Sequence, residues 1–150
     1  MIVRRRAYIW MAVMAVIAYG CAKKNSAPGE HAFHASTAPA DTIGRGPWRW
    51  IATVTPSSRT VCTNPDVYTI TFLPDSTARL LIDCNRGSGR YHIDGHSIHI
   101  GPVASTRMMC PPGSMDTTFA SQLQRANAWH VETDTLQLDT VGESQMLLVR

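Results

Sequence analysis

The sequence lacks an excess of charge of either sign once its N-terminus is set aside. The chain of 150 residues has 14 Lys and Arg residues against 11 Asp and Glu residues. Three of the basic residues, Arg4, Arg5 and Arg6, lie at the N-terminus, and without residues 1–20 both counts are 11. Proteins that bind DNA or RNA carry a basic patch or stripe. The balanced charge of residues 21–150 therefore gives no sign of nucleic-acid binding or of a polybasic membrane patch.

The sequence also lacks an apolar run long enough to cross a membrane. A spanning helix needs about 20 apolar residues, and the apolar run at residues 7–19 is shorter. This run follows the three arginines and precedes small residues, which is the pattern of a secretory signal peptide. We therefore predict that residues 1–20 are a cleaved signal peptide and that the mature chain is exported.

Cysteines are few, and the first of the four follows the apolar run directly. Gly20-Cys21 is similar to a bacterial lipobox, in which a diacylglyceryl group is attached to the cysteine. Acyl chains anchor a protein to a membrane with about 0.8 kcal/mol per buried methylene. We predict that Cys21 is lipidated; the alternative is ordinary secretion with a free or removed Cys21. Because Ala22 is not the Asp of inner-membrane retention signals, we expect an outer-membrane anchor that faces the periplasm.

Residues 22–46 have neither a helical nor a strand periodicity. Ala, Ser, Thr, Pro and Gly dominate this segment, and its apolar content is too low to offset the entropy cost of ordering it. We therefore predict a lipidated cysteine and flexible tether over residues 21–46 and one folded domain over residues 47–150.

Alternating apolar residues predict an antiparallel sheet in the folded domain. The alternation has the period of strands that bury one face, and Asp94-Gly95 favours a two-residue hairpin turn. Apolar residues at helical spacing run from Met115 to Ala126 after a Pro-rich turn. We predict a β-rich α+β fold, an antiparallel barrel-like or sandwich sheet with one helix inserted between strands. The predicted strands are residues 48–54, 67–73, 77–84, 90–93, 96–100, 128–132, 136–139 and 145–149.

The first strand contains a Trp-x-Trp pair, which has two interpretations. Trp48 and Trp50 could bind a sugar or a peptide, but the burial tendency of tryptophan favours a role in the core, with Val54 as a further inward residue.

Residue types also predict the connections between the elements. Because glycine permits positive φ, we expect Asn85 to Gly89 to form a tight loop. With Asp94-Gly95 as turn residues, Tyr91 lies opposite Ile98. Ser114 is the expected N-cap of the helix.

Cys84 and Cys110 each lie at the end of a predicted strand, next to a turn-rich stretch. Disulfides persist in exported proteins, so we predict that both residues belong to a structural disulfide. Closing a loop of this length contributes about 3.5 kcal/mol on the chain-entropy model. A catalytic thiol is the alternative, because basic residues follow Cys84. Cys62 could pair with either cysteine, so the sequence leaves the connectivity open.

No motif indicates a catalytic residue, a metal or a cofactor. The Gly-rich segment after Cys84 could cradle an anion, but it lacks the Lys-Ser/Thr ending of a P-loop and a following helix. Zinc needs three or four convergent ligands, and strand alternation separates His96 from His92 and His99. No Ser-His-Asp order and no paired-carboxylate spacing stands out.

Two cysteine-bearing segments together resemble the signature of the META/HslJ family. The opening Trp-x-Trp, the strand at residues 68–72 and the helix fit the layout of the family, so the resemblance covers about residues 47–149. The residues that carry it are Cys84, Asn85, Arg86, Ser88, Gly89 and Tyr91 in the first segment, and Thr106, Arg107, Met108, Met109 and Cys110 in the second.

The resemblance implies a compact β-rich domain with one helix in a bacterial envelope lipoprotein. Family members are linked to heat shock, novobiocin resistance and, in protozoan relatives, virulence or motility, and no catalytic activity is established for them. A non-enzymatic envelope protein that binds a protein partner and supports stress tolerance is therefore our first hypothesis. The second is a periplasmic inhibitor or pilot-type binding lipoprotein, such as a lysozyme inhibitor or a secretin chaperone. The third is a thiol or metal enzyme.

Overall fold

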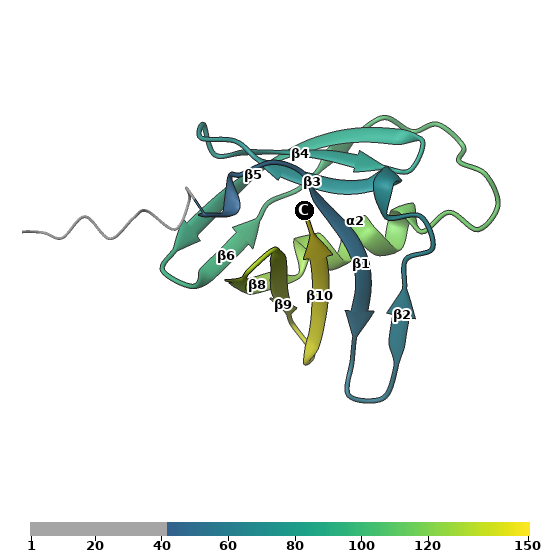
Figure 1. The fold of residues 1–150 in the computed structure, drawn as a ribbon. Coiled ribbons are helices and arrows are strands. Elements are labelled where there is room, and N and C mark those ends of the chain that lie inside the picture. The colour runs from purple at the N-terminus through teal and green to yellow at the C-terminus, as the bar shows by residue number, and fades with distance from the viewer. Residues whose placement is uncertain (1–41) are drawn as a thin grey trace, which may run out of the picture. The chain divides into compact units, whose positions relative to one another are not determined.

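The computed structural model describes residues 42–150, where antiparallel strands form one continuous sheet and a helix is inserted between the seventh and eighth strands (Figure 1). The strands are β1 (Trp48–Val54), β2 (Arg59–Val61), β3 (Tyr68–Phe72), β4 (Thr77–Ile82), β5 (Asn85–Asp94), β6 (Ser97–Ile100), β7 (Ala104–Ser105), β8 (Ala126–Glu132), β9 (Thr135–Thr140) and β10 (Ser144–Val149). The helices are the short 3₁₀ helix η1 (Pro65–Val67) and the α-helix α2 (Asp116–Gln124).

The sheet closes on itself into an 8-stranded barrel. The hydrogen-bonded order is β1, β3, β4, β5, β6, β8, β9 and β10, and β10 returns to β1 through pairs from Arg49↔Val149 to Val54↔Gln145. Figure 1 shows β10 in yellow beside β1 in blue. β2 pairs with β1 and β7 with β5, outside this closed path. The predicted barrel-like antiparallel fold is confirmed.

Side chains on the inward face of each strand fill the barrel interior. Trp48 and Trp50 are fully buried, so the core interpretation of the Trp-x-Trp pair is correct. A register shift between Trp50 and Ala52 puts Ala52 and Thr53 both inside. Val54 is consequently half-buried, and its predicted place in the core is wrong. Ile43, in the segment that the sequence assigns to the tether, is fully buried, and its carbonyl accepts a bond from the Trp48 indole.

α2 covers the core with two apolar side chains at helical spacing. Phe119 and Leu123 are fully buried, and the Phe119 ring stacks on Trp50 with 5.5 Å between centroids. The helix contacts β4, β6 and β9, which lie in different parts of the barrel wall. Ser114 lies one residue before the N-cap instead of occupying it, and Ala126 is the first residue of β8, so both predicted helix boundaries need correction.

The predicted loop from Asn85 to Gly89 is wrong, because these residues begin β5. The tight turn is Asp83-Cys84, where Asp83 takes φ 58°. The glycines are needed for close approach: a Cβ on Gly87 would lie 2.9 Å from the Val103 side chain, and one on Gly89 would lie 3.0 Å from the Pro102 carbonyl. Glycine inside a strand often marks such an approach.

The hairpin of β5 and β6 is shifted from the predicted register. Tyr91 lies opposite Ile100, and the turn residues are Gly95 and His96. This register pairs apolar residues across the strands, and it lets the Trp129 indole donate to the Gly95 carbonyl at 3.1 Å. The sequence also missed the short outer strand β2, which lies between the predicted strands at residues 48–54 and 67–73.

Candidate functional site

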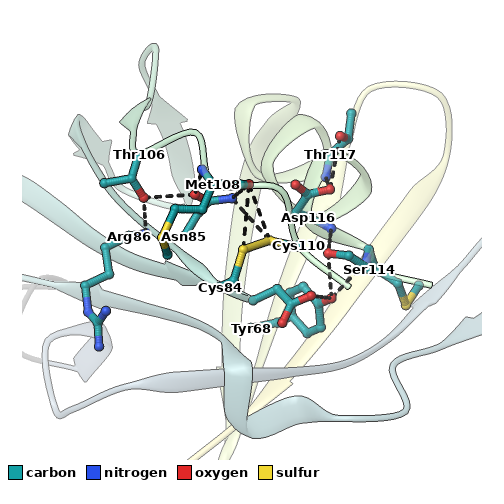
Figure 2. The surroundings of a disulfide bond; sticks show 12 residues. Tyr68, Cys84, Asn85, Arg86, Thr106, Met108, Cys110, Ser114, Asp116 and Thr117 are labelled. Carbon is teal, nitrogen blue, oxygen red and sulfur yellow. Dashed lines mark hydrogen bonds between the residues drawn. A yellow bond between two sulfur atoms is a disulfide. The ribbon is translucent and has the colours of Figure 1, made fainter. Parts of the chain in front are cut away.

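A disulfide joins the β4–β5 turn to the loop that precedes α2. Cys84 and Cys110 are bonded, with 5.5 Å between their Cα atoms and 26 residues of separation. Cys62 is free and buried. The structure therefore contains the predicted disulfide and settles the connectivity. Figure 2 shows this bond beside Asn85 and Tyr68.

Next to the disulfide, the buried side chain of Asn85 holds residues 106–110, here called the 106–110 loop. Its Oδ1 accepts hydrogen bonds from the Met108 backbone N–H at 2.8 Å and from the Thr106 hydroxyl at 2.9 Å. Its Nδ2 donates to the Met108 carbonyl and to the Cys110 sulfur, both at 3.2 Å. One amide thus satisfies both polar groups of Met108, as a buried polar group requires.

Arg86 contributes to this loop through its backbone and not through its guanidinium group. Its N–H donates to the Thr106 hydroxyl at 3.1 Å, and its carbonyl accepts from the Thr106 N–H at 3.0 Å. The Arg86 side chain points away from the disulfide in Figure 2. We call Cys84, Asn85, Thr106 and Cys110 the loop clamp, because these side chains fix the 106–110 loop.

Tyr68, on β3, fixes the chain on the other side of Cys110. Its hydroxyl accepts a hydrogen bond from the Met115 N–H at 2.8 Å and lies 3.3 Å from an Asp83 carboxylate oxygen, to which it donates. Its ring packs edge-on against Trp50 and Phe119. Tyr68 therefore connects the start of α2 to the aromatic core next to the loop clamp.

The clamped loop presents apolar side chains to solvent. Met109 is 99% exposed and Met108 is 57% exposed, while Arg107 beside them is exposed as well. A cavity of about 450 Å³ lies between this loop and the first turns of α2, with Asp116 and Thr117 on the helix side. The hydrogen bonds of Asn85 thus fix the backbone of this loop, and Met109 extends from it into solvent as an exposed apolar side chain.

The remaining motif residues in the first segment support the fold. Gly89 makes room for Pro102, as described above. Tyr91 is buried, and its hydroxyl donates to the Leu73 carbonyl at 2.8 Å. Burial, and secondarily the charge of Asp75, raises the pKa of Tyr91 above its ordinary value of 10.0.

Other candidates from the sequence separate in the structure or lie outside it. Cys21 is outside the described residues. His92 and His99 face each other on the exposed side of β5 and β6, and His96 is in the turn near Trp129. Within residues 42–150, no three His, Cys, Asp or Glu side chains gather as a metal site would need. No helix in that range is long and apolar enough to span a bilayer.

Sequence reasoning missed the contacts between this region and residues that are far from it in the sequence. Tyr68 belongs to a strand pattern, and nothing in that pattern shows that its hydroxyl reaches Met115. Side-chain types also give no sign that the backbone N–H and carbonyl of Met108 are the groups that Asn85 binds. A signal did exist for Asn85, since a polar residue at an inward position of a strand must find partners.

Comparisons with known proteins agree with this architecture. The META domain family matches residues 41–150. A protein from Burkholderia xenovorans, solved by NMR, is similar in fold at 19% identity and TM-score 0.62, with 74% of this chain and 85% of that one covered. A DUF4847 family protein from Bacteroides vulgatus, solved by crystallography, is similar at 17% identity and TM-score 0.56, with coverage of 73% and 94%. No curated protein matches the sequence. The chain belongs to the META domain family.

Proposed function

We propose that this META-family protein is a non-enzymatic, lipid-anchored envelope protein that binds another envelope protein. In this role it supports tolerance of envelope stress and of antibiotics. Its anchor is the lipidated Cys21, and its barrel faces the periplasm from the outer membrane. The part of the predicted tether that precedes Ile43 gives the barrel reach from that surface.

The loop clamp is the observation that carries this proposal. The side chains of Cys84, Asn85 and Thr106 are bonded to one another or to the loop, so their polar atoms are occupied in holding structure. What they hold outward is Met109, which is 99% exposed. Displaying an apolar side chain from a fixed backbone suits partner binding better than chemical catalysis, which needs free nucleophiles or bases.

Complementation of a deletion strain tests this function. We expect loss of the gene to lower survival under heat and novobiocin, and the full chain to restore it. Cys21→Ser should restore less, because it removes the acylated thiol, and intact mass before and after reduction and alkylation reports both lipid and disulfide. Full restoration by Cys21→Ser at equal protein level, or no phenotype on deletion, would contradict the proposal.

A second candidate is an inhibitor or pilot-type lipoprotein, such as a lysozyme inhibitor or a secretin chaperone, and the protruding 106–110 loop favours it. In that role the 106–110 loop would be the element that contacts the target. Met109→Ser should then abolish inhibition of lysozyme or delivery of secretin without lowering the stability of the barrel. Activity that is unchanged by this substitution would exclude the loop as the inhibitory element.

A further inference from the structure

The outer face of β3, β4 and β5 carries three arginines in a staggered row. Arg79 on β4 lies opposite Ser88, so it is diagonal both to Arg86 and to Arg90 on β5. All three side chains are exposed. Diagonal neighbours in an antiparallel pair are about 7–8 Å apart, close enough for like charges to repel. We call these residues the arginine row.

No member of this row forms an ion pair with a carboxylate of the described region. The ion pairs found in residues 42–150 are Arg49–Asp66 and Arg150–Asp134, and neither contains a member of the row. Residues 42–150 have as many acidic as basic residues, so the row is a local excess of positive charge on a balanced domain. Such an excess favours an anionic partner.

The row borders a groove with a mixed lining. Arg79 and Arg86 line a depression of about 750 Å³ together with hydroxyl residues such as Thr71, Ser88 and Ser105, and Leu81 gives it an apolar part. Arg90 continues the row beyond the groove. Guanidinium groups bind carboxylates in a two-pronged geometry, and hydroxyls can donate to or accept from a peptide backbone.

The spacing of the row matches an extended chain. Along the strand direction, the members follow one another at intervals of two residues, because Thr77↔Arg90, Arg79↔Ser88 and Leu81↔Arg86 are successive outward pairs. Side chains at i, i+2 and i+4 of an extended segment share one face at the same interval of about 6.6 Å. Acidic residues at alternate positions of such a segment would each meet one arginine.

We propose that the arginine row binds an extended segment of a partner protein that carries acidic residues at alternate positions. This inference deepens the proposed function by giving the partner its chemistry. A bilayer surface fits the row less well, because the row has three arginines, whereas recognition of anionic lipids takes a cluster of about four to eight basic residues.

Fluorescence anisotropy tests the proposal with the full chain purified in detergent. The probe is a labelled peptide of alternating Glu and Thr, and the control peptide has Gln in place of Glu. The test variant is Arg79→Gln/Arg86→Gln. The matched control is Arg45→Gln/Arg59→Gln, which removes the same charge from exposed residues outside the groove. We expect the test variant to weaken binding by about 2- to 30-fold, as for two exposed ion pairs, and the control to weaken it little.

Three results would overturn the inference. They are equal binding of the Glu and Gln peptides, equal weakening by both double variants, and binding only to vesicles that contain phosphatidylglycerol. Complementation of the deletion strain separates this inference from the proposed function. If the chain restores tolerance but the acidic peptide does not bind, the inference alone fails. If the peptide binds through the row but the chain restores nothing, the proposed function alone fails.

Discussion

A single buried amide, Asn85, holds the 106–110 loop with both of its polar atoms. Its oxygen accepts from Thr106 and Met108, and its nitrogen donates to Met108 and Cys110. Aspartate has nearly the same shape, but its ionised carboxylate has no donor in place of Nδ2, and at neutral pH it would face the Met108 carbonyl with a negative charge. The motif therefore needs asparagine at this position for its pattern of donors and acceptors.

Replacing Asn85 by alanine should lower the free energy of unfolding by about 1–3 kcal/mol, since it leaves the polar groups of Met108 without partners. Urea denaturation followed by tryptophan fluorescence measures this. Asn127→Ala is the control, because Asn127 is exposed on β8. Equal stability of the two variants would show that the amide does not hold the loop.

The one free cysteine of the described region, Cys62, should be nearly inert while the protein is folded. Its side chain is 4% exposed, and burial, partly opposed by a backbone hydrogen bond from Asn64, raises the pKa of its thiol above 9.0. The reactive thiolate is therefore disfavoured in the native state. The unfolded thiol ionises first, so the stability due to Cys62 is full below its unfolded pKa and is lost as pH rises through the folded value.

We expect Cys62 to be alkylated about a hundredfold more slowly in native buffer than in denaturant, because labelling needs local opening. Mass spectrometry of peptides after iodoacetamide treatment, without reductant, reports each cysteine separately. Cys84 and Cys110 should stay unlabelled even in denaturant. Rapid native labelling of Cys62, or any labelling of the other two, would contradict the structure.

At the scale of elements, β5 depends on two glycines, Gly87 and Gly89, because the segment of residues 101–105 passes close to their Cα atoms. Gly87→Ala would bring a methyl group to 2.9 Å from the Val103 side chain. Val103 is short and branched, so it cannot turn aside freely. β5 or β7 would have to shift instead.

Gly87→Ala should lower the free energy of unfolding by about 1–3 kcal/mol, the usual cost of overpacking. Gly101→Ala is the matched control: its nearest contact would be 3.4 Å, and φ there is not in the left-handed region. We expect this control within about 1 kcal/mol of the wild type. Thermal denaturation followed by circular dichroism compares the two, and a control that is as damaged as Gly87→Ala would refute the steric reason.

The disulfide is the second support of this part of the fold. Removing it with Cys84→Ala/Cys110→Ala should lower the free energy of unfolding by about 3.5 kcal/mol on the chain-entropy model. Reductant should destabilise the wild type by a similar amount and leave the double variant unchanged. Equal sensitivity of both proteins to reductant would mean that the bond does not form.

The sequence predicts most elements, and its errors have physical causes. Strong alternation at residues 68–72 and the helical spacing of Phe119 and Leu123 identify their elements without help from the rest of the fold. The segment from Asn85 to Gly89 was misassigned because glycine occurs both in tight turns and in strands that another segment approaches closely. Only the position of Val103 in the fold shows that these glycines have the second role. The β5–β6 register was misassigned because apolar pairing across the strands outweighed the local preference of Asp94-Gly95.

The residues of the candidate site were predictable from the sequence, but the contacts by which they hold the 106–110 loop were not. The two cysteine-bearing segments identify the family, and the structure shows that they meet at the disulfide. The arginine row was not predicted, because reading residues 85–89 as a loop removed Arg86 from the strand alternation that places it beside Arg79.

At the scale of the whole molecule, stability depends on closing the barrel. Leu148 is fully buried on β10, the strand that pairs with both β9 and β1. Leu148→Asp should unfold the domain, because an unpaired buried charge costs an amount comparable to a total stability of about 5–15 kcal/mol.

Val61→Asp is the matched control, since Val61 is 56% exposed on β2, outside the closed path. We expect it to stay folded, within about 0.5 kcal/mol of the wild type. Size-exclusion chromatography and the dispersion of amide signals in NMR spectra distinguish the outcomes. A folded Leu148→Asp protein would mean that β10 is dispensable.

The pairing of the last strand with the first also orders events in time. β1 is synthesised early but cannot gain its β10 partner until residues 144–149 exist, and topologies with such distant pairs fold slowly. Cys84 and Cys110 are only 26 residues apart, so their bond can form while the barrel is still open. We therefore expect the disulfide to form before the barrel closes, so that the chain needs an oxidant before its core is complete.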